Sequence, residues 1–272
     1  MALAGARERL TLWLMTPRDR LDINRHLKQV IAANVIENGP FSPVRLVFSD
    51  LRPLLARWGR PFVDRIEPSG SFSKGTAVRG GTDIDVFVSL RSTLDLPLRD
   101  IYERLFSHFD VEGFAPRRQN VSVGIRCRGY SVDVTPARRQ AQTGNFHSLF
   151  SNRTGAWLQT NVQRHRVHVS SSGRLDEIRL FKIWRNRFGL DWPSFYLELF
   201  VIDALQRAPR GALFANIPIV LEAVRDRVAL RRLVDPANSN NVVSNTLDAT
   251  EKAYLSGAAA RALNMQWEEV FQ

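Results

Sequence analysis

The stretch Gly70-Ser71-Phe72-Ser73-Lys74-Gly75-Thr76, followed by Thr82-Asp83-Ile84-Asp85-Val86-Phe87-Val88, decides the fold. In its second half, carboxylate and apolar residues alternate, as they do in a β-strand with one buried face. Asp83 and Asp85 then share one face of the strand, about 7 Å apart. The first half is a turn of small and hydroxyl-bearing residues with Lys74 beside it, and its backbone N–H groups can bind phosphate. The stretch predicts a phosphate-binding turn opposite a pair of metal-binding acids.

A third acid, Asp133, lies in a predicted β-hairpin. Apolar and polar residues alternate over 121–127 and again over 130–134, with a turn signal at Arg128-Gly129 and Pro136 as the expected end of the second strand. Three carboxylates on adjacent strands fit two-metal phosphoryl transfer, in which divalent cations activate a hydroxyl and stabilise the leaving pyrophosphate. Magnesium prefers such oxygen ligands, so the predicted ligands are Asp83, Asp85 and Asp133. Asp133 is also a candidate acceptor for the hydroxyl proton.

Helical periodicity predicts helices on both sides of these strands. The expected helices cover residues 18–35, 50–58, 98–109, 172–188, 194–205, 217–230 and 249–271. The expected N-caps are Ser49 or Asp50, Ser171 or Ser172, and Ser194. Residues 62–67 read as a strand, 140–172 are too irregular to assign, and 235–241 read as a polar loop. We therefore expect an α/β half over residues 1–150 and a helical half over residues 151–272.

Composition limits the class of protein. The chain has 272 residues, of which 44% are hydrophobic, enough for one large domain or two closely packed ones. The single cysteine, Cys127, excludes an intrachain disulfide and a cysteine-based zinc site. The longest apolar run, 197–205, is interrupted by acids and too short to span a bilayer, and Leu10 to Met15 lack the flanks of a signal peptide. We expect a cytoplasmic protein without a membrane span. The net charge of +11 favours polyanionic partners.

The order of these motifs resembles the DNA polymerase β-type nucleotidyltransferase superfamily. The matching residues are Gly70-Ser71, Asp83-Ile84-Asp85 and Tyr130-Ser131-Val132-Asp133-Val134-Thr135-Pro136. Each motif alone is common, but the three in order, each in its expected local setting, are a specific signal. The resemblance implies an α+β fold, with a mixed sheet and flanking helices packed on a C-terminal helical domain. It also implies two Mg²⁺ ions, with Mn²⁺ as a substitute, and a triphosphate on the serine turn.

Further segments resemble the branch of oligoadenylate synthases, cyclic GMP-AMP synthase, bacterial cyclic-oligonucleotide synthases and archaeal CCA-adding enzymes. The segments are Thr160-Asn161-Val162 with His165, the helix Arg179 to Trp184, Ser194-Phe195-Tyr196-Leu197-Glu198, and Asp235 to Val242. Val162 departs from the proline of that branch. The resemblance implies that Lys182 and Ser194 contact phosphates and that Phe195 or Tyr196 stacks on a base.

Simpler explanations exist for several of these residues. Lys74 fits a solvated surface turn, Lys182 fits a lysine extending past a core stripe, and Phe195 and Tyr196 fit core aromatics. His147, His165 and His168 have no metal-ligand spacing. An arginine-rich surface around the third-acid hairpin reads equally as a solvated edge or as a groove for an oligonucleotide or RNA. Its members are Arg117, Arg118, Arg126, Arg128, Arg138 and Arg139.

The resemblance implies transfer of a nucleoside monophosphate from an NTP or dNTP to a hydroxyl with release of pyrophosphate. The expected product is a cyclic or linear oligonucleotide second messenger in bacterial antiphage defence. Alternatives are nucleotide addition to the 3′ end of RNA, AMP transfer to protein, and a catalytically silent nucleic-acid-binding module. The expected partners are nucleoside triphosphates, an oligonucleotide or RNA, and an effector or regulator protein. Base, sugar, linkage and any need for an activator stay open.

Overall fold

The computed structural model describes residues 16–36, 39–80 and 83–271. Thr82 and the apolar patch Leu10 to Met15 lie outside these residues. The chain divides into two compact units. Of the described residues, the sheet unit comprises those within Ile36–Leu175 and Arg232–Val243, and the helical unit comprises 16–35, 176–231 and 244–271. The division into domains 1–150 and 151–272 stays a prediction, because a compact unit is not necessarily a separately folding domain.

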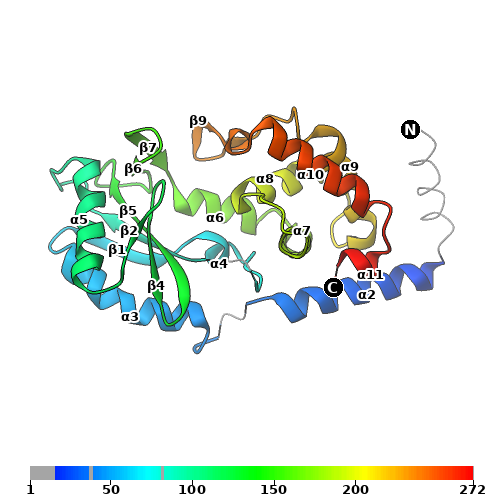
Figure 1. Cartoon of the computed structure of the whole chain (residues 1–272), viewed down its shortest axis with the longest axis horizontal. Helices are drawn as coiled ribbons and strands as arrows, with labels where there is room; N and C mark the ends of the chain where they lie inside the picture. The colour runs from blue at the N-terminus through cyan, green and yellow to red at the C-terminus, as the bar shows by residue number, and fades with distance from the viewer. Residues whose placement is uncertain (1–15, 37–38, 81–82, 272) are drawn as a thin grey trace. The chain divides into compact units, whose positions relative to one another are not determined.

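The sheet unit has a mixed sheet with helices against it (Figure 1). Its helices are α3 (Pro43–Trp58), α4 (Gly70–Lys74), α5 (Leu98–Val111) and α6 (Val162–Ser170). Its strands are β1 (Val63–Pro68), β2 (Ile84–Leu90), β3 (Arg117–Arg118), β4 (Val123–Cys127), β5 (Tyr130–Arg139), β6 (His147–Ser151), β7 (Ala156–Thr160), β8 (Val234–Asp235) and β9 (Asn238–Val242). The main sheet has the order β1-β2-β5-β4-β3, extended by β6 and β7, and β8 pairs with β9. β2 and β5 are parallel, whereas the other pairs are antiparallel.

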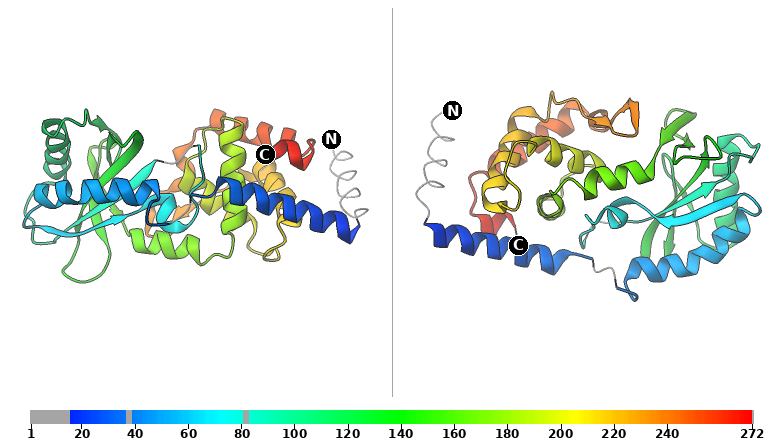
Figure 2. Two further views of the ribbon diagram at one scale, coloured as in Figure 1. Left: turned by 90° about the horizontal axis from the view of Figure 1, so that it is seen from below. Right: turned by 180° about the vertical axis from the view of Figure 1, so that it is seen from behind.

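The two faces of the sheet differ in polarity because side chains alternate along each strand. One face carries the main core, formed with α3 and α5. Figure 2 shows α3 crossing in front of the strands when the structure is seen from below. Ile84, Val86 and Val88 of β2 point into this core. The opposite face carries Asp85 and Asp133, together with a smaller apolar cluster around Phe87. The acids therefore lie on the face that α3 and α5 do not cover.

The helical unit is arranged around α9. Its elements are α2 (Pro17–Asn34), α7 (Leu175–Arg187), α8 (Ser194–Ala204), α9 (Leu213–Arg227), a 3₁₀ turn (Val243–Thr246), α10 (Ala249–Ala262) and α11 (Trp267–Val270). α2, α8 and α10 all pack on α9. The C-terminal end lies beside α2, where the His26 ring is 3.3 Å from the carbonyl oxygen of Phe271 (Figure 2). None of the described helices combines the length and apolar character needed to cross a membrane.

Several predicted boundaries are wrong, and three have clear physical reasons. α3 begins earlier, because Ser42 caps it with Pro43 in its first turn. Pro53 lies inside this helix and has no N–H to donate to the carbonyl oxygen of Ser49. Ser49 is exposed, so water can bind that oxygen instead. β5 continues through Pro136, because the last β4–β5 pair is at Val134 and no strand on that side needs the missing N–H.

Other differences concern the ends of helices and one loop. Ser194 is the first residue of α8 and not its cap, which is Pro193. Ser171 ends α6, and α7 begins only at Leu175. The polar loop predicted at 235–241 is part of the β8–β9 hairpin, and the predicted C-terminal helix is two helices, α10 and α11.

Candidate active site

Two of the three predicted acids are neighbours across the parallel β2–β5 pair. Asp85 and Asp133 are register partners, so their Cα atoms are about one strand spacing apart, roughly 4.8 Å. Both side chains leave the sheet on the same face, because directly opposite residues of paired strands do so. Side chains alternate between the two faces along each strand, so the same alternation that buries Val86 and Val134 on one face brings Asp85 and Asp133 together on the other.

Gly70 brings the serine turn against Asp85. A Cβ atom on Gly70 would lie only 1.7 Å from Oδ2 of Asp85, and the residue has a φ of +56°. Both facts favour glycine, since a side chain would overlap the carboxylate and the left-handed backbone disfavours other residues. The N–H of Ser69 donates to the backbone oxygen of Asp85 at 2.9 Å. The predicted closeness of the turn and the acid is therefore present.

Ser71 and Lys74 are both buried in the turn. The Oγ atom of Ser71 is buried and has no hydrogen-bond partner among the described residues. A buried hydroxyl without a partner costs free energy unless a ligand satisfies it. Lys74 is 7% exposed, so the simple explanation of a solvated surface lysine is wrong. The Ser71 hydroxyl can therefore donate a hydrogen bond to an anionic group. The phosphate roles of Ser71 and Lys74 stay predictions.

Asp83 is exposed and precedes β2 by one residue, so it is not part of the strand itself. Burial of Asp133, followed by repulsion from Asp83, raises the pKa of Asp133 to about 6. Among the residues that the structure describes, no three His, Cys, Asp or Glu side chains form a ready metal-ligand group.

The oxygen donors present fit Mg²⁺. Asp85 and Asp133 are register partners that offer carboxylate oxygens, and Asp83 lies one residue before β2. Mg²⁺ binds through one or two carboxylates plus substrate phosphates and water. The metal roles of the three acids stay predictions, and this adjacency supports them.

One residue beside the acids has no counterpart among the sequence predictions. The side-chain amide of Gln119 donates to Oδ1 of Asp133 at 2.8 Å. The residue precedes the predicted hairpin in a bend, and its sequence context carries no signal for a role near the acids. Only the folded arrangement of the 119–122 bend brings it there.

Two of the predicted nucleotide-contacting residues of the helical unit, Lys182 and Ser194, have partners within that unit. Nζ of Lys182 lies 2.7 Å from Oε1 of Glu198, and both side chains are buried. The hydroxyl of Ser194 accepts a hydrogen bond from Nη1 of Arg185 at 2.8 Å. The prediction of phosphate contacts for Lys182 and Ser194 is untested by these contacts, but any such role would have to compete with them.

The two predicted stacking residues differ in exposure. Tyr196 is completely buried, burial raises its pKa to about 12, and its hydroxyl donates to the carbonyl oxygen of Val228 at 3.3 Å. Phe195 is half-buried at the beginning of α8. Of the two residues, Phe195 is therefore the better candidate for contact with a base.

The arginine-rich surface already has partners for most of its charges. These partners are Glu103 for Arg118, Asp50 for Arg128, Asp64 for Arg139, and backbone carbonyl oxygens for Arg126 and Arg138. An oligonucleotide would have to compete with these contacts. The binding of RNA or an oligonucleotide along this surface stays a prediction.

His165 has a structural partner. Its Nε2 atom donates to Oδ1 of Asp235 at 2.6 Å, which ties α6 to the β8–β9 hairpin. Burial alone would raise the pKa of Asp235, but hydrogen bonds from His165, Ala237 and Asn241 outweigh it and hold that pKa below its usual value. The segments that resembled a common branch, around His165 and Asp235, therefore meet in space.

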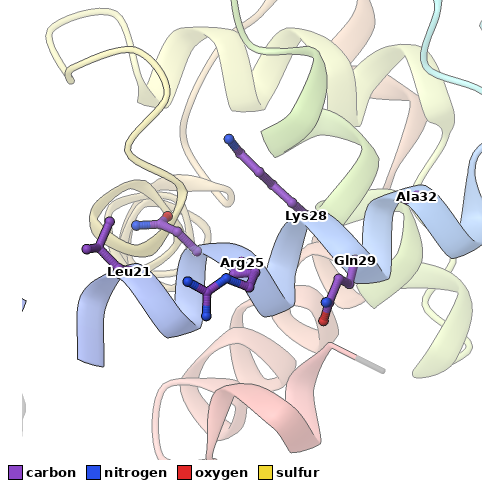
Figure 3. A pocket seen from close by; sticks show the side chains of 6 residues that line it. Leu21, Arg25, Lys28, Gln29 and Ala32 are labelled. Carbon is purple, nitrogen blue, oxygen red and sulfur yellow. The ribbon is translucent and has the colours of Figure 1, made fainter. Parts of the chain in front are cut away.

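A separate pocket lies on α2, away from all predicted site residues in the sequence. It has a volume of about 430 Å³, and Figure 3 shows side chains of this one helix lining it. The lining residues are Leu21, Asn24, Arg25, Lys28, Gln29 and Ala32. None of the predicted site residues belongs to it.

Comparison with known proteins addresses the fold. No protein-family model matches the chain. Structures of CdnC from Escherichia coli MS115-1, one with ATP and one in a complex with HORMA-deltaN, cover 87% of this chain and 90% and 89% of theirs. They have 20% sequence identity and TM-scores of 0.67 and 0.62. The chain has the polymerase β-like nucleotidyltransferase fold. The predicted α+β fold class and the predicted superfamily resemblance are confirmed.

Two further structures show the breadth of this nucleotidyltransferase fold. The CD-NTase CdnG of Bradyrhizobium diazoefficiens with GTP has 14% identity and a TM-score of 0.67, covering 88% of this chain and 89% of that one. The Cid1 poly(U) polymerase with Mg 3′-dATP has 14% identity and a TM-score of 0.63, covering 92% and 98%. At these identities the likeness shows the fold alone.

A curated relative is closer in sequence. The cyclic AMP-AMP-AMP synthase of Escherichia coli (strain MS 115-1) is 30% identical over 176 residues, covering 58% of this chain and 54% of the relative. The chain therefore spans about half the length of the curated relative that it matches. The resemblance to bacterial cyclic-oligonucleotide synthases is confirmed at this level.

Proposed function

We propose that the chain transfers a nucleoside monophosphate from a nucleoside triphosphate to a hydroxyl group and releases pyrophosphate. The observation that carries the proposal is the close approach of Gly70 to Asp85, beside the register pair of Asp85 and Asp133. It brings a buried serine hydroxyl and two carboxylates to one place on a rigid sheet. That combination suits a triphosphate held between a turn and cation-binding acids.

In this proposal, Asp83, Asp85 and Asp133 hold two Mg²⁺ ions, for which Mn²⁺ substitutes. When bound, such ions stabilise the charge of the triphosphate and lower the pKa of the attacking hydroxyl. In this proposal Asp133 also accepts the proton of that hydroxyl. Ser71 donates to the phosphates, and Lys74 neutralises part of their charge.

The proposed acceptor is a second nucleotide, and the proposed product is a cyclic or linear oligonucleotide that acts as a second messenger in antiphage defence. The 30% identity to a cyclic AMP-AMP-AMP synthase supports this acceptor and favours ATP as a substrate. The complex of CdnC with HORMA-deltaN supports a regulator protein as a partner of this chain.

Incubation of the purified chain with each labelled triphosphate and Mg²⁺ or Mn²⁺ tests the proposal. We expect phosphatase-resistant oligonucleotides, identified by mass, from the wild type. Asp85→Asn removes a carboxylate charge beside Asp133, and a loss of several kcal/mol of transition-state stabilisation lowers turnover on the order of 10³-fold. Asp95→Asn, an exposed acid outside the site, is the control. Undiminished turnover of Asp85→Asn would contradict the metal role.

Nucleotide addition to the 3′ end of RNA is the second candidate. The likeness to Cid1, over 92% of this chain, favours it. Label in added RNA, rather than in small phosphatase-resistant products, would distinguish this candidate from the first. Label on protein would indicate AMP transfer, and Mg²⁺-dependent triphosphate binding without turnover on any acceptor would indicate a silent binding module.

A further inference from the structure

A row of aligned residues crosses the sheet at the level of the acids. Asp85 on β2 is opposite Asp133 on β5, Asp133 is opposite Gly124 on β4, and Gly124 is opposite Arg117 on β3. All four positions share one face. Gly124 is the position in this row without a side chain, so the sheet surface next to Asp133 is open there.

The side chain of Gln119 occupies that open surface. Its Nε2 atom donates to Oδ1 of Asp133 at 2.8 Å. A Cβ atom on Gly124 would lie 2.8 Å from this Nε2 atom and 3.5 Å from Oδ1 of Asp133. The absence of a side chain at Gly124 therefore makes the hydrogen bond between Gln119 and Asp133 sterically possible.

The orientation of the Gln119 amide is fixed from its other side. The hydroxyl of Ser122 donates to Oε1 of Gln119 at 2.9 Å, and the N–H of Gln119 donates to the Ser122 carbonyl oxygen at 3.1 Å. The buried hydroxyl of Tyr102, on α5, donates to the same Ser122 carbonyl oxygen at 2.9 Å. Because an ionised carboxylate only accepts, the NH₂ end must face Asp133. The bend thus presents one N–H in a set direction.

We propose that Gln119 is a positioning residue of the active site, held by Ser122 and Tyr102 and admitted by Gly124, that fixes the orientation of the Asp133 carboxylate. Its hydrogen bond occupies one lone pair of Oδ1 and restricts rotation of the carboxylate about its last bond. Oδ2 is then left for a divalent cation or for the acceptor hydroxyl. This role rests on the proposed nucleotidyl transfer, because it supports the acid that performs it.

Two variants remove the hydrogen bond in different ways. Gln119→Met keeps a side chain of similar length but has no N–H. Gly124→Ala keeps Gln119 and displaces its amide, since the added Cβ meets the end of a flexible side chain in extended backbone. Gln140→Met is the matched control, because Gln140 is an exposed glutamine of the same unit that hydrogen-bonds Ser148.

The primary measurement is the affinity of the protein for Mn²⁺ in the presence of a non-hydrolysable ATP analogue. Electron paramagnetic resonance quantifies the free Mn²⁺ in each titration. We expect 10- to 100-fold weaker binding for Gln119→Met and Gly124→Ala, the usual loss when a partner of a metal ligand is removed. Wild-type affinity is expected for Gln140→Met. Thermal unfolding, recorded for each variant, separates this effect from a loss of folding.

Turnover measured at saturating Mg²⁺ is the second readout. Partial recovery of both variants at high Mg²⁺ supports a positioning role, since a merely structural defect would not depend on the cation. Folded variants with wild-type Mn²⁺ affinity would overturn the role. If Gln119→Met does not fold, Gly124→Ala alone decides. A wild type that neither binds Mn²⁺ nor transfers a nucleotide would instead overturn the proposed function, and the positioning role with it.

Discussion

Gly70 combines two constraints at a single residue. Its backbone has a φ of +56°, and the space that a side chain would need is filled by the Asp85 carboxylate. The first constraint alone costs a substituted residue about 1–2 kcal/mol. The second displaces the acid itself, so the two constraints have separable effects on stability and on activity.

Gly70→Ala is therefore expected to lower nucleotide transfer by at least about 100-fold, because a misplaced reacting group costs that much in many enzymes. Gly129→Ala is the control, since Gly129 has a φ of +81° with nothing within 4 Å of an added Cβ. In urea unfolding, both variants are expected to lose the stability that a positive φ costs, and Gly70→Ala is expected to lose more because of its overlap with Asp85. Only Gly70→Ala is expected to lose turnover. Equal turnover of the two variants would contradict a role for this approach in catalysis.

Lys182 and Glu198 form a buried ion pair between α7 and α8, with side chains 1% and 0% exposed. Removal of one partner leaves a buried charge, so Lys182→Met is expected to lower the free energy of unfolding by about 3–5 kcal/mol. The double variant Lys182→Met with Glu198→Leu is expected to recover much of that loss. Denaturant unfolding measures both effects. A stable Lys182→Met variant with weakened triphosphate binding would instead favour the predicted phosphate contact.

At the scale of elements, period-two alternation predicted the positions of β2 and β5 and the shared face of Asp85 and Asp133, but not the start of β2 after Asp83 or the extension of β5 beyond Pro136. The alternation of apolar and polar residues can be read from a few neighbouring positions, because it follows directly from the burial of one face of a strand. Gln119 was not predictable in the same way, because its contact depends on the bend at 119–122 and on the missing side chain of Gly124. The sequence around Gln119 indicates neither the path of this bend nor the position of Gly124 beside it.

The unassigned region 140–172 illustrates a second limit of sequence reasoning. It contains β6, β7 and α6. Asn161 caps α6 by accepting from the N–H of Arg164 at 2.9 Å, which is a recognisable signal in retrospect. The β8–β9 hairpin had no such signal, because its polar strands are held by Gln159 and His165, far away in sequence. Tertiary contacts decide short polar elements of this kind.

β6 gives the sheet a pH-sensitive position. His147 is buried, its Nδ1–H donates to the Asn145 carbonyl oxygen, and its Nε2 atom lies 2.8 Å from the Ser89 hydroxyl. Burial lowers the pKa of His147 below its usual value of 6.5. The unfolded chain therefore binds this proton at a higher pH than the folded chain. The free energy of unfolding therefore carries no penalty from His147 above pH 6.5. It decreases as the pH falls below 6.5, because the unfolded chain then binds the proton more readily.

We expect the wild type to lose up to about 1.4 kcal/mol of unfolding free energy per pH unit from this residue below pH 6.5. His147→Gln does not titrate, so the difference in stability between the two proteins is expected to shift in favour of the variant between pH 7.5 and pH 5. Urea unfolding at several pH values measures this difference. A difference that does not change with pH would contradict the assignment.

At the scale of the molecule, the chain leaves the sheet unit after Leu175 and returns to it for residues 232–243. Asp235 anchors this return through three hydrogen bonds, from His165, Ala237 and Asn241. Asp235→Ala is expected to cost about 2–3 kcal/mol, as for the loss of buried hydrogen bonds to a charged group. It should also speed proteolytic cleavage within 236–241.

The control for that prediction is Asn240→Ala, an exposed residue of the same hairpin whose change is expected to stay within about 0.5 kcal/mol. Urea unfolding and limited proteolysis of the full chain measure the two effects. Unchanged cleavage of Asp235→Ala would show that the hairpin is held by other contacts, such as the hydrogen bond from Gln159 to the Ala237 carbonyl oxygen.

The interleaved path of the chain has a consequence for biosynthesis. Domains usually fold in the order in which the ribosome delivers them. Here, α6 cannot gain its partner Asp235 until the segment up to residue 243 has emerged, after α7, α8 and α9 have been made. α2, the first helix that the structure describes, waits for α9 before it can pack. Neither unit can be completed during early translation, so the nascent chain depends on late contacts to protect the apolar surfaces of both.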